Sequence, residues 1–228
     1  MDIVLVAGLW LDAHAWDEVV PHLEAHGHQV RAVTLPGQGD GATTATLIDQ
    51  LAAVVAAIDA SADPPLVVGH SAACTLAWLA ADARPDRVAK VALIGGFPTS
   101  NGKRYADFLP TENGVMPFPG WEPFAGPDSD DLNHQMRVGI EERAIAVPEG
   151  VTKALVRYGD ARRHEVPALI ICPEFTPDDA RAWIESGDVP EMAQAKNLEL
   201  VDIDSGHWPM ISTPVVLAEA LQAATTSG

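Results

Sequence analysis

Ser71 stands in the string Gly-His-Ser-Ala-Ala at residues 69–73, between an apolar stretch and a helix-forming stretch. A serine on a sharp turn from a strand into a helix is typical of a nucleophile that attacks a carbonyl carbon. The neighbouring residues must be small, because the turn is strained and the strand and helix pass close together. The string matches G-x-S-x-G with alanine in the last position. It is short, and Ser71 could instead simply cap the helix.

His207 is the predicted base. A serine hydroxyl reacts only when a base takes its proton and a third group orients that base. For a serine on such a turn the expected chain order is serine, acid, histidine. His207 follows the last predicted strand, within Ser-Gly-His-Trp at residues 205–208. The carboxyl ends of parallel strands share one edge of the sheet, so we expect His207 to lie near Ser71.

Glu174 is the predicted acid. Three carboxylates, Glu174, Asp178 and Asp179, follow the strand predicted at residues 168–172. The two aspartates fall in the first turn of a predicted helix, where they complement the helix dipole and cap backbone amides. Glu174 precedes that helix and has no such structural role. Asp204 is the reserve assignment, although it more simply ends its strand as a turn residue.

Two backbone amides are predicted to bind the oxyanion that forms during acyl transfer. The Ala72 amide follows the nucleophile at a helix N-terminus, and the Leu9 amide lies in the loop after the first strand. Four aromatic residues near these loops are predicted to line the substrate pocket: Trp10, Phe118, Trp121 and Trp208. The aromatic run that contains Phe118 could also serve only to pack an inserted segment onto the sheet.

Along the chain that carries these candidate residues, predicted strands alternate with predicted helices. Strands are predicted at residues 2–7, 29–35, 65–68, 88–94, 168–172 and 198–203, and helices at residues 14–26, 44–60, 74–82, 177–186 and 213–224. The pattern predicts a three-layer α/β fold, with a mostly parallel sheet and helices on both faces. The alternation of strands and helices stops at residues 97–165, a proline-rich and aromatic stretch with one predicted helix at 131–145. An excursion of this length predicts a lid or cap.

The composition limits the classes of partner. With 228 residues, 47% of them hydrophobic, the chain is expected to form one α/β domain over residues 1–228. The formal net charge of −18 argues against nucleic acid and anionic membranes as partners. Two cysteines do not suggest a disulfide framework and favour a reducing cytoplasm. The apolar run at residues 3–11 lacks a basic flank and a cleavage pattern, so it predicts a strand rather than a signal peptide. The oligomeric state stays open between monomer and homodimer.

No cofactor or metal site is predicted. The glycines at residues 37–39 fit a relaxed dinucleotide fingerprint, but the next strand ends in the serine turn instead of a ribose-binding acid. His22 and His26 share a helix face, but the glutamate is misplaced for the zinc motif His-Glu-x-x-His. A solvated helix face explains them better.

Five segments together resemble the α/β-hydrolases, most of all the branch of plant methylesterases, hydroxynitrile lyases and small bacterial hydrolases. The segments lie at residues 4–10, 33–39, 69–73, 91–98 and 204–208, and the likeness extends over nearly the whole chain. The resemblance implies a cofactor-independent serine hydrolase that cleaves a small, fairly apolar carboxylic ester through an acyl-enzyme. A non-hydrolytic member, either a cofactor-free lyase or a ligand-binding protein, is the alternative.

The chain also departs from that pattern. Family members usually have His-Gly after the first strand, where Ala7-Gly8 stands here. Their catalytic aspartate would align near Phe175, so this chain must use the adjacent Glu174 or an acid from elsewhere. A resembling lyase would carry threonine at Gly8 and lysine at Trp208, and the absence of both favours hydrolysis.

Overall fold

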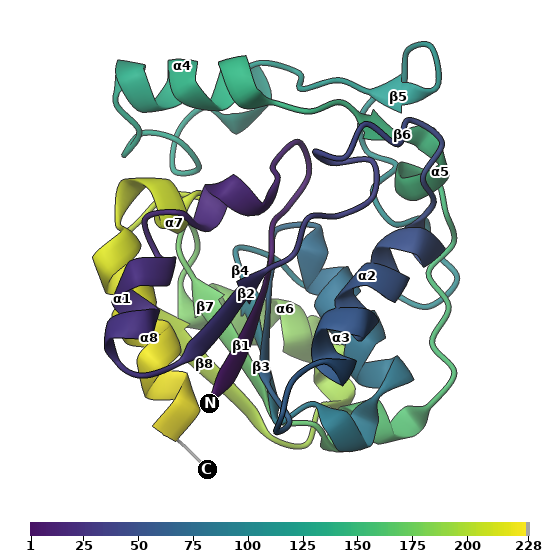
Figure 1. The fold of residues 1–228 in the computed structure, drawn as a ribbon, viewed down its shortest axis with the longest axis vertical. Coiled ribbons are helices and arrows are strands. Elements are labelled where there is room, and N and C mark those ends of the chain that lie inside the picture. Colours follow the sequence, from purple (N-terminus) through teal and green to yellow (C-terminus); the bar gives the residue numbers. More distant parts are fainter. Residues whose placement is uncertain (227–228) are drawn as a thin grey trace.

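The computed structural model describes residues 1–226, and its centre is a six-stranded sheet (Figure 1). The strands are β1 (Asp2–Val6), β2 (Gln29–Ala32), β3 (Leu66–His70), β4 (Lys90–Ile94), β7 (Ala168–Cys172) and β8 (Leu198–Asp202). They lie in the order β2-β1-β3-β4-β7-β8, and every neighbouring pair is parallel. All six strands therefore end at one edge of the sheet.

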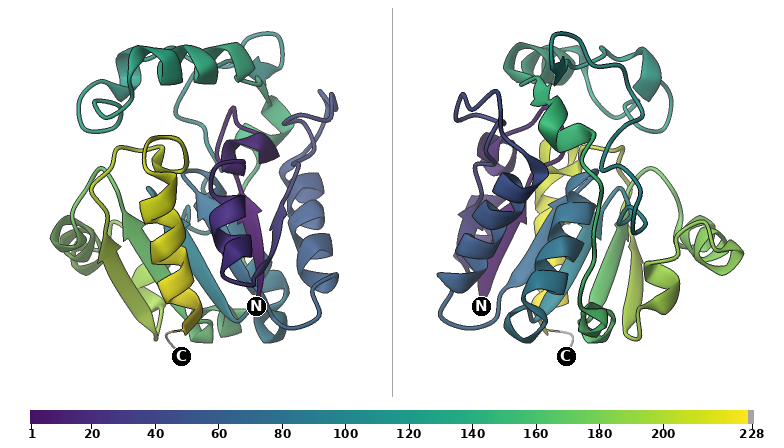
Figure 2. Two further views of the ribbon diagram at one scale, coloured as in Figure 1. Left: turned by 60° about the vertical axis from the view of Figure 1, so that its left-hand side comes forward. Right: turned by 90° about the vertical axis from the view of Figure 1, so that its right-hand side faces the viewer.

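Helices cover both faces of the sheet, as the sequence predicts. On one face lie α2 (Leu47–Asp59), α3 (Ala73–Ala83) and α6 (Pro177–Ser186), and on the other lie α1 (Val20–Ala25) and α8 (Pro214–Thr226) (Figures 1 and 2). Alternate residues of one strand serve the two faces, since successive side chains point in opposite directions. In β1, Val4 and Val6 pack toward α2 and α3, while Ile3 and Leu5 pack toward α1 and α8.

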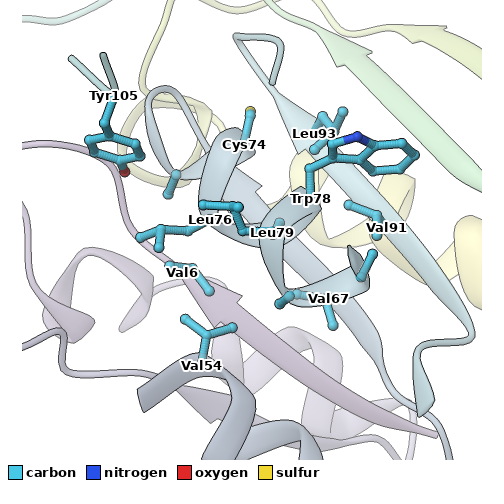
Figure 3. Close-up of a cluster of buried hydrophobic side chains, with 14 of the residues drawn as sticks. Val6, Val54, Val67, Cys74, Leu76, Trp78, Leu79, Val91, Leu93 and Tyr105 are labelled. Carbon is cyan, nitrogen blue, oxygen red and sulfur yellow. The ribbon is translucent and has the colours of Figure 1, made fainter. Parts of the chain in front are cut away.

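The core beneath α3 holds the serine turn against the sheet. Figure 3 shows Leu76 and Leu79 of α3 in one cluster with Val54 of α2 and the strand residues Val6 and Val67. All of these side chains are buried, and α3 is apolar over most of its circumference. A helix that is apolar all round is stable only inside a protein, so tertiary packing fixes α3 and the turn that precedes it.

The segment between β4 and β7, here called the insertion (residues 97–165), crosses the carboxyl edge of the sheet (Figures 1 and 2). It contains β5 (Val115–Met116), α4 (His134–Arg143), β6 (Val147–Pro148) and α5 (Glu149–Thr152). The strands β5 and β6 form a small antiparallel pair. Ile140 of α4 is buried in the same apolar cluster as Leu11 and Trp208, so α4 is packed against the sheet's loops.

Several predicted elements differ from the structure: the strand predicted at residues 29–35 ends at Ala32, and the helix predicted at 44–60 begins at Leu47. The helix predicted at residues 14–26 is a short 3₁₀ helix, Ala13–Trp16, followed by a separate α1. Pro21 lies in the first turn of α1, because proline lacks the amide hydrogen that a continuous helix would need there. Thr213 directly precedes α8, where a threonine often caps a helix, but its buried Oγ1 has no hydrogen-bond partner.

Within residues 1–226, no helix is long and apolar enough to cross a membrane. Cys74 and Cys172 are both buried and unpaired. The cytoplasmic location inferred from the cysteine content stays a prediction.

Candidate active site

Ser71 occupies the turn between β3 and α3 with a φ of 55°, in the left-handed region that side chains rarely adopt. The turn is held by the Ser71 amide, which donates to the Ile94 carbonyl at 2.8 Å. A side chain at Gly69 would collide with the Ala73 carbonyl, so only glycine lets the helix leave the strand so closely. The strained turn projects Ser71 at the carboxyl edge of the sheet.

His207 joins Ser71 to Glu174. Its Nε2 lies 2.9 Å from Ser71 Oγ, and its Nδ1 lies 2.6 Å from Glu174 Oε1. The side chains of His207 and Glu174 are only 15% and 13% exposed. A carboxylate can only accept, so Nδ1–H donates to Glu174, which leaves Nε2 able to accept the Ser71 proton. The three residues predicted from the sequence thus form one hydrogen-bonded series.

The competing carboxylates have other partners or positions. Asp179 forms a capping box with Thr176 at the start of α6, and Asp178 pairs with Arg181. Asp204 is exposed. Among the four carboxylates that the sequence offered, Glu174 is therefore the one bonded to His207.

The loop that carries His207 is held from two sides. From the insertion, the Asp128 carbonyl accepts the His207 amide at 2.7 Å, and Asp131 Oδ2 accepts the Gly206 amide at 2.7 Å. From the serine turn, His70 Nε2 lies 2.7 Å from the His207 carbonyl oxygen. Burial lowers the pKa of His70 to about 3, so its neutral ring donates this bond through Nε2–H.

The Leu9 and Ala72 amides have no acceptor within the described residues. Ala72 directly precedes α3, and Gly8 packs directly against the serine turn. A Cβ at Gly8 would lie 2.9 Å from Ser71 Cβ and 2.9 Å from His70 Nδ1. The Leu9 loop and the serine turn are therefore in contact, and both candidate donors are free to bind an external oxygen.

A cavity of about 600 Å³ opens beside Ser71. Its lining comes from the serine turn, the end of β4 and the first part of the insertion: Ser71, Ala72, Thr75, Gly95, Gly96, Phe97, Thr99, Arg104, Tyr105, Ala106, Asp107 and Phe108. The two threonine hydroxyls are satisfied internally. Thr99 donates its amide to Thr75 Oγ1 at 3.0 Å, and Thr99 Oγ1 bonds the Tyr105 carbonyl at 3.3 Å.

Comparisons with known proteins identify the family of this chain. The profile of the Alpha/beta hydrolase family matches residues 3–220, nearly the whole chain. The chain belongs to the alpha/beta hydrolase family. Methylesterase 7 of Arabidopsis thaliana is 35% identical to this hydrolase, over 96% of this chain and 94% of its own.

Solved structures share the fold of this hydrolase at lower identity. An extracellular alpha/beta-hydrolase from a Paenibacillus species has a TM-score of 0.80 at 18% identity, with 98% of each chain covered. A methylesterase from Arabidopsis has a TM-score of 0.77 at 15% identity, with 99% of each chain covered. A pyrethroid hydrolase from Sphingobium faniae has a TM-score of 0.73 at 20% identity, covering 100% of this chain and 98% of its own.

The aromatic residues predicted for the pocket of this hydrolase do not line the cavity beside Ser71. They pack on one another instead, in contacts whose ring centroids lie 5.2–5.9 Å apart and join Trp10, Phe118, Trp121, Phe124 and Trp208. Trp10 and Trp208 are 6% and 3% exposed. For Phe118 and Trp121, the second interpretation of the sequence, packing of the inserted segment onto the sheet, describes the observed contacts.

Ser71 and Ala72 were predicted as site residues, but sequence reasoning missed the rest of the cavity lining. Thr99, Tyr105 and Phe108 lie at the start of the insertion, where no motif marks them individually. The signal that was present is their position directly after β4, since loops at the carboxyl edge of such a sheet form its binding sites.

Proposed function

We propose that this protein is a cofactor-independent serine hydrolase that cleaves a small, apolar carboxylic ester through an acyl-enzyme. The observation that carries the proposal is the hydrogen-bonded series from Glu174 through His207 to Ser71, beside a cavity. The relatives named as methylesterases support ester cleavage as the reaction class.

Acylation begins when Ser71 Oγ attacks the ester carbonyl carbon and His207 Nε2 takes the hydroxyl proton. The carbonyl electron pair moves onto its oxygen, which the Leu9 and Ala72 amides stabilise. The tetrahedral intermediate then expels the alcohol as the carbon–oxygen bond breaks. His207 gives its proton to that leaving oxygen, and the acyl group stays on Ser71.

Deacylation repeats these steps with water. His207 takes a proton from water, the hydroxide attacks the acyl carbon, and the bond to Ser71 breaks. The proton returns to Ser71 Oγ and the carboxylic acid leaves. In both stages Glu174 holds the imidazole tautomer and stabilises the imidazolium.

The lining of the cavity favours a substrate whose acyl or alcohol group is apolar. The hydroxyls of Thr75 and Thr99 bond to each other and to backbone groups, so they offer little to a polar substituent. Phe97 and Phe108 supply apolar walls. The two charged residues of the lining, Arg104 and Asp107, pair with each other at 2.8 Å, so the aromatic walls favour hydrocarbon on the substrate.

Ser71→Ala tests the mechanism, with Ser186→Ala at an exposed position as control. We expect loss of p-nitrophenyl ester hydrolysis and of fluorophosphonate labelling in Ser71→Ala, with both retained in the control. Hydrolysis at the wild-type rate by Ser71→Ala would refute the mechanism. Binding of esters without turnover or labelling in the wild-type protein would favour the non-hydrolytic alternative.

A further inference from the structure

Two buried glutamines lie behind the Leu9 loop, outside the cavity. Gln38 is 1% exposed and Gln50 is 0% exposed. Gln38 belongs to the glycine-containing loop after β2, and Gln50 lies in the first turns of α2. Burying an amide side chain costs free energy unless it is hydrogen-bonded, and an apolar residue would fill such a position at lower cost.

Gln38 uses both of its amide hydrogens on the loop after β1. Its Nε2 donates to the Gly8 carbonyl at 2.8 Å and to the Leu11 carbonyl at 2.8 Å. Backbone carbonyls only accept, so these two bonds establish which end of the Gln38 amide faces the loop. Gln38 therefore clamps both ends of the Gly8–Leu11 turn.

Gln50 in turn holds Gln38. Its Nε2 donates to Gln38 Oε1 at 3.0 Å and to the Pro36 carbonyl at 2.9 Å. Gln50 Oε1 is buried and has no hydrogen-bond partner. Both hydrogens on Gln50 Nε2 are donated, whereas Oε1 accepts nothing. This indicates that the role of the Gln50 side chain is to donate hydrogen bonds.

The clamp on Gly8 has a consequence for Leu9. The peptide bond between these residues is planar, and in the trans form its C=O and N–H point in opposite directions. Because Gln38 holds the Gly8 oxygen on the α2 side, the Leu9 N–H faces away from that side. Gly8 itself packs against Ser71. An oxyanion donor is effective only when it is oriented before the reaction, since reorientation would cost free energy in the transition state.

We propose that Gln38, supported by Gln50, is a positioning residue that sets the direction of the Leu9 N–H toward the developing oxyanion. The proposal rests on the ester hydrolysis proposed above. Neither glutamine touches substrate. Gln38 acts through the Gly8–Leu9 peptide, and Gln50 acts through Gln38.

The first experiment compares Gln38→Leu, Gln50→Leu and the double variant, with the exposed Gln29→Leu as matched control. We expect Gln38→Leu to lower kcat by about 10- to 100-fold, below the full loss of an oxyanion donor, with KM changed by less than about twofold. Affinity for a boronic acid that forms a tetrahedral adduct with Ser71 falls by the same factor. Gln50→Leu has a smaller effect.

The double variant separates positioning from general stability. If Gln50 acts through Gln38, adding Gln50→Leu to Gln38→Leu lowers kcat no further. A merely structural pair would lower stability and leave kcat unchanged. An unchanged kcat in folded Gln38→Leu, or a loss confined to KM, would overturn the proposal.

A second measurement needs no turnover. In NMR spectra, the Leu9 amide of Gln38→Leu should show exchange broadening on the microsecond to millisecond timescale, while the Ala72 amide keeps its wild-type relaxation. A Leu9 amide as rigid as in the wild type would overturn the inference even if esterase activity were absent. Failure of wild-type ester hydrolysis and labelling would instead refute the proposed function alone.

Discussion

His70 Nε2 lies 2.7 Å from the carbonyl oxygen of His207, so the residue before the serine holds the loop that carries its base. The two rings lie 5.0 Å apart between centroids. Because His70 is fully buried and its Nδ1 has no partner, a second proton on this ring would be costly. The serine turn and the histidine loop are thus joined by a neutral imidazole.

His70 predicts an acid-dependent loss of stability. Burial lowers its folded-state pKa from 6.5 to about 3, so below pH 6.5 the unfolded chain binds this proton first. The contribution of His70 is present above that pH and is lost as the pH falls toward 3, at up to about 1.4 kcal/mol per pH unit. We expect His70→Gln, which cannot take up that proton, to show a shallower dependence of unfolding free energy on pH in urea titrations.

His134→Gln, at an exposed position, serves as a control for the loss of a histidine. Carboxylates that protonate in this pH range are present in all three proteins. The difference between the slopes therefore reports the protonation of His70. Parallel curves for His70→Gln and the wild type would contradict the prediction.

Glu174→Gln tests the choice of acid. The amide keeps the size of the side chain but cannot stabilise the imidazolium, so we expect kcat for ester hydrolysis to fall by about 10²- to 10⁴-fold with little change in KM. Asp178→Asn and Asp204→Asn should keep kcat near the wild-type value. Asp179→Asn should leave kcat unchanged, because Asp179 bonds Thr176 in the α6 capping box. A larger kcat loss in any aspartate variant would refute the assignment of Glu174.

Asp131→Ala tests whether the insertion orients His207. The Asp131 carboxylate accepts the Gly206 amide, and its loss frees the residue preceding His207. We expect kcat to fall about tenfold, the order of effect that follows from small misplacement of a catalytic group, with the fold retained in circular dichroism. The neighbouring, exposed Asp130→Ala is the control. Equal activity in the two variants would show that Asp131 does not position the histidine loop.

Phe108→Ala tests the use of the cavity beside Ser71. Phe108 lines the cavity and is 64% exposed, so its removal should not disturb the core. Losing about 40 Å² of apolar contact corresponds to about 1 kcal/mol, so KM for long-chain p-nitrophenyl esters should rise about fivefold. KM for the acetate ester should stay the same. Ile48→Ala, which removes another exposed apolar side chain, should change neither constant. A uniform change across chain lengths would count against the cavity as the site of the ester's hydrocarbon.

Much of the fold follows from local patterns. The apolar runs at residues 168–172 and 2–6 need burial on two faces, which only a covered parallel sheet provides, and both are strands in the structure. The helix over residues 177–186 begins where its capping box and proline predict. The break near Pro21 was missed because the apolar spacing continues through it, although the proline itself was a visible signal.

Some residues of the candidate site could be identified from the sequence, and others could not. Ser71, His207 and Glu174 could be named from the chain because each follows a strand, and all parallel strands end at one edge. The cavity lining could not be named, because the path of the insertion over that edge depends on packing among residues far apart in sequence. Trp10, Phe118, Trp121 and Trp208 carry the same aromatic chemistry whether they bind substrate or pack together, so only their contacts distinguish the two.

The amino-acid sequence alone determined the alternation of strands and helices, the strained serine turn and the histidine and acid that follow later strands. Tertiary structure decided that Glu174 bonds His207 while Asp179 caps a helix, and that Gln38 clamps a loop 30 positions earlier in the chain. The physical reason is the distance along the chain over which each interaction acts. Backbone propensity and burial act on neighbouring residues, whereas hydrogen bonds between buried side chains form only after the sheet has brought distant segments together.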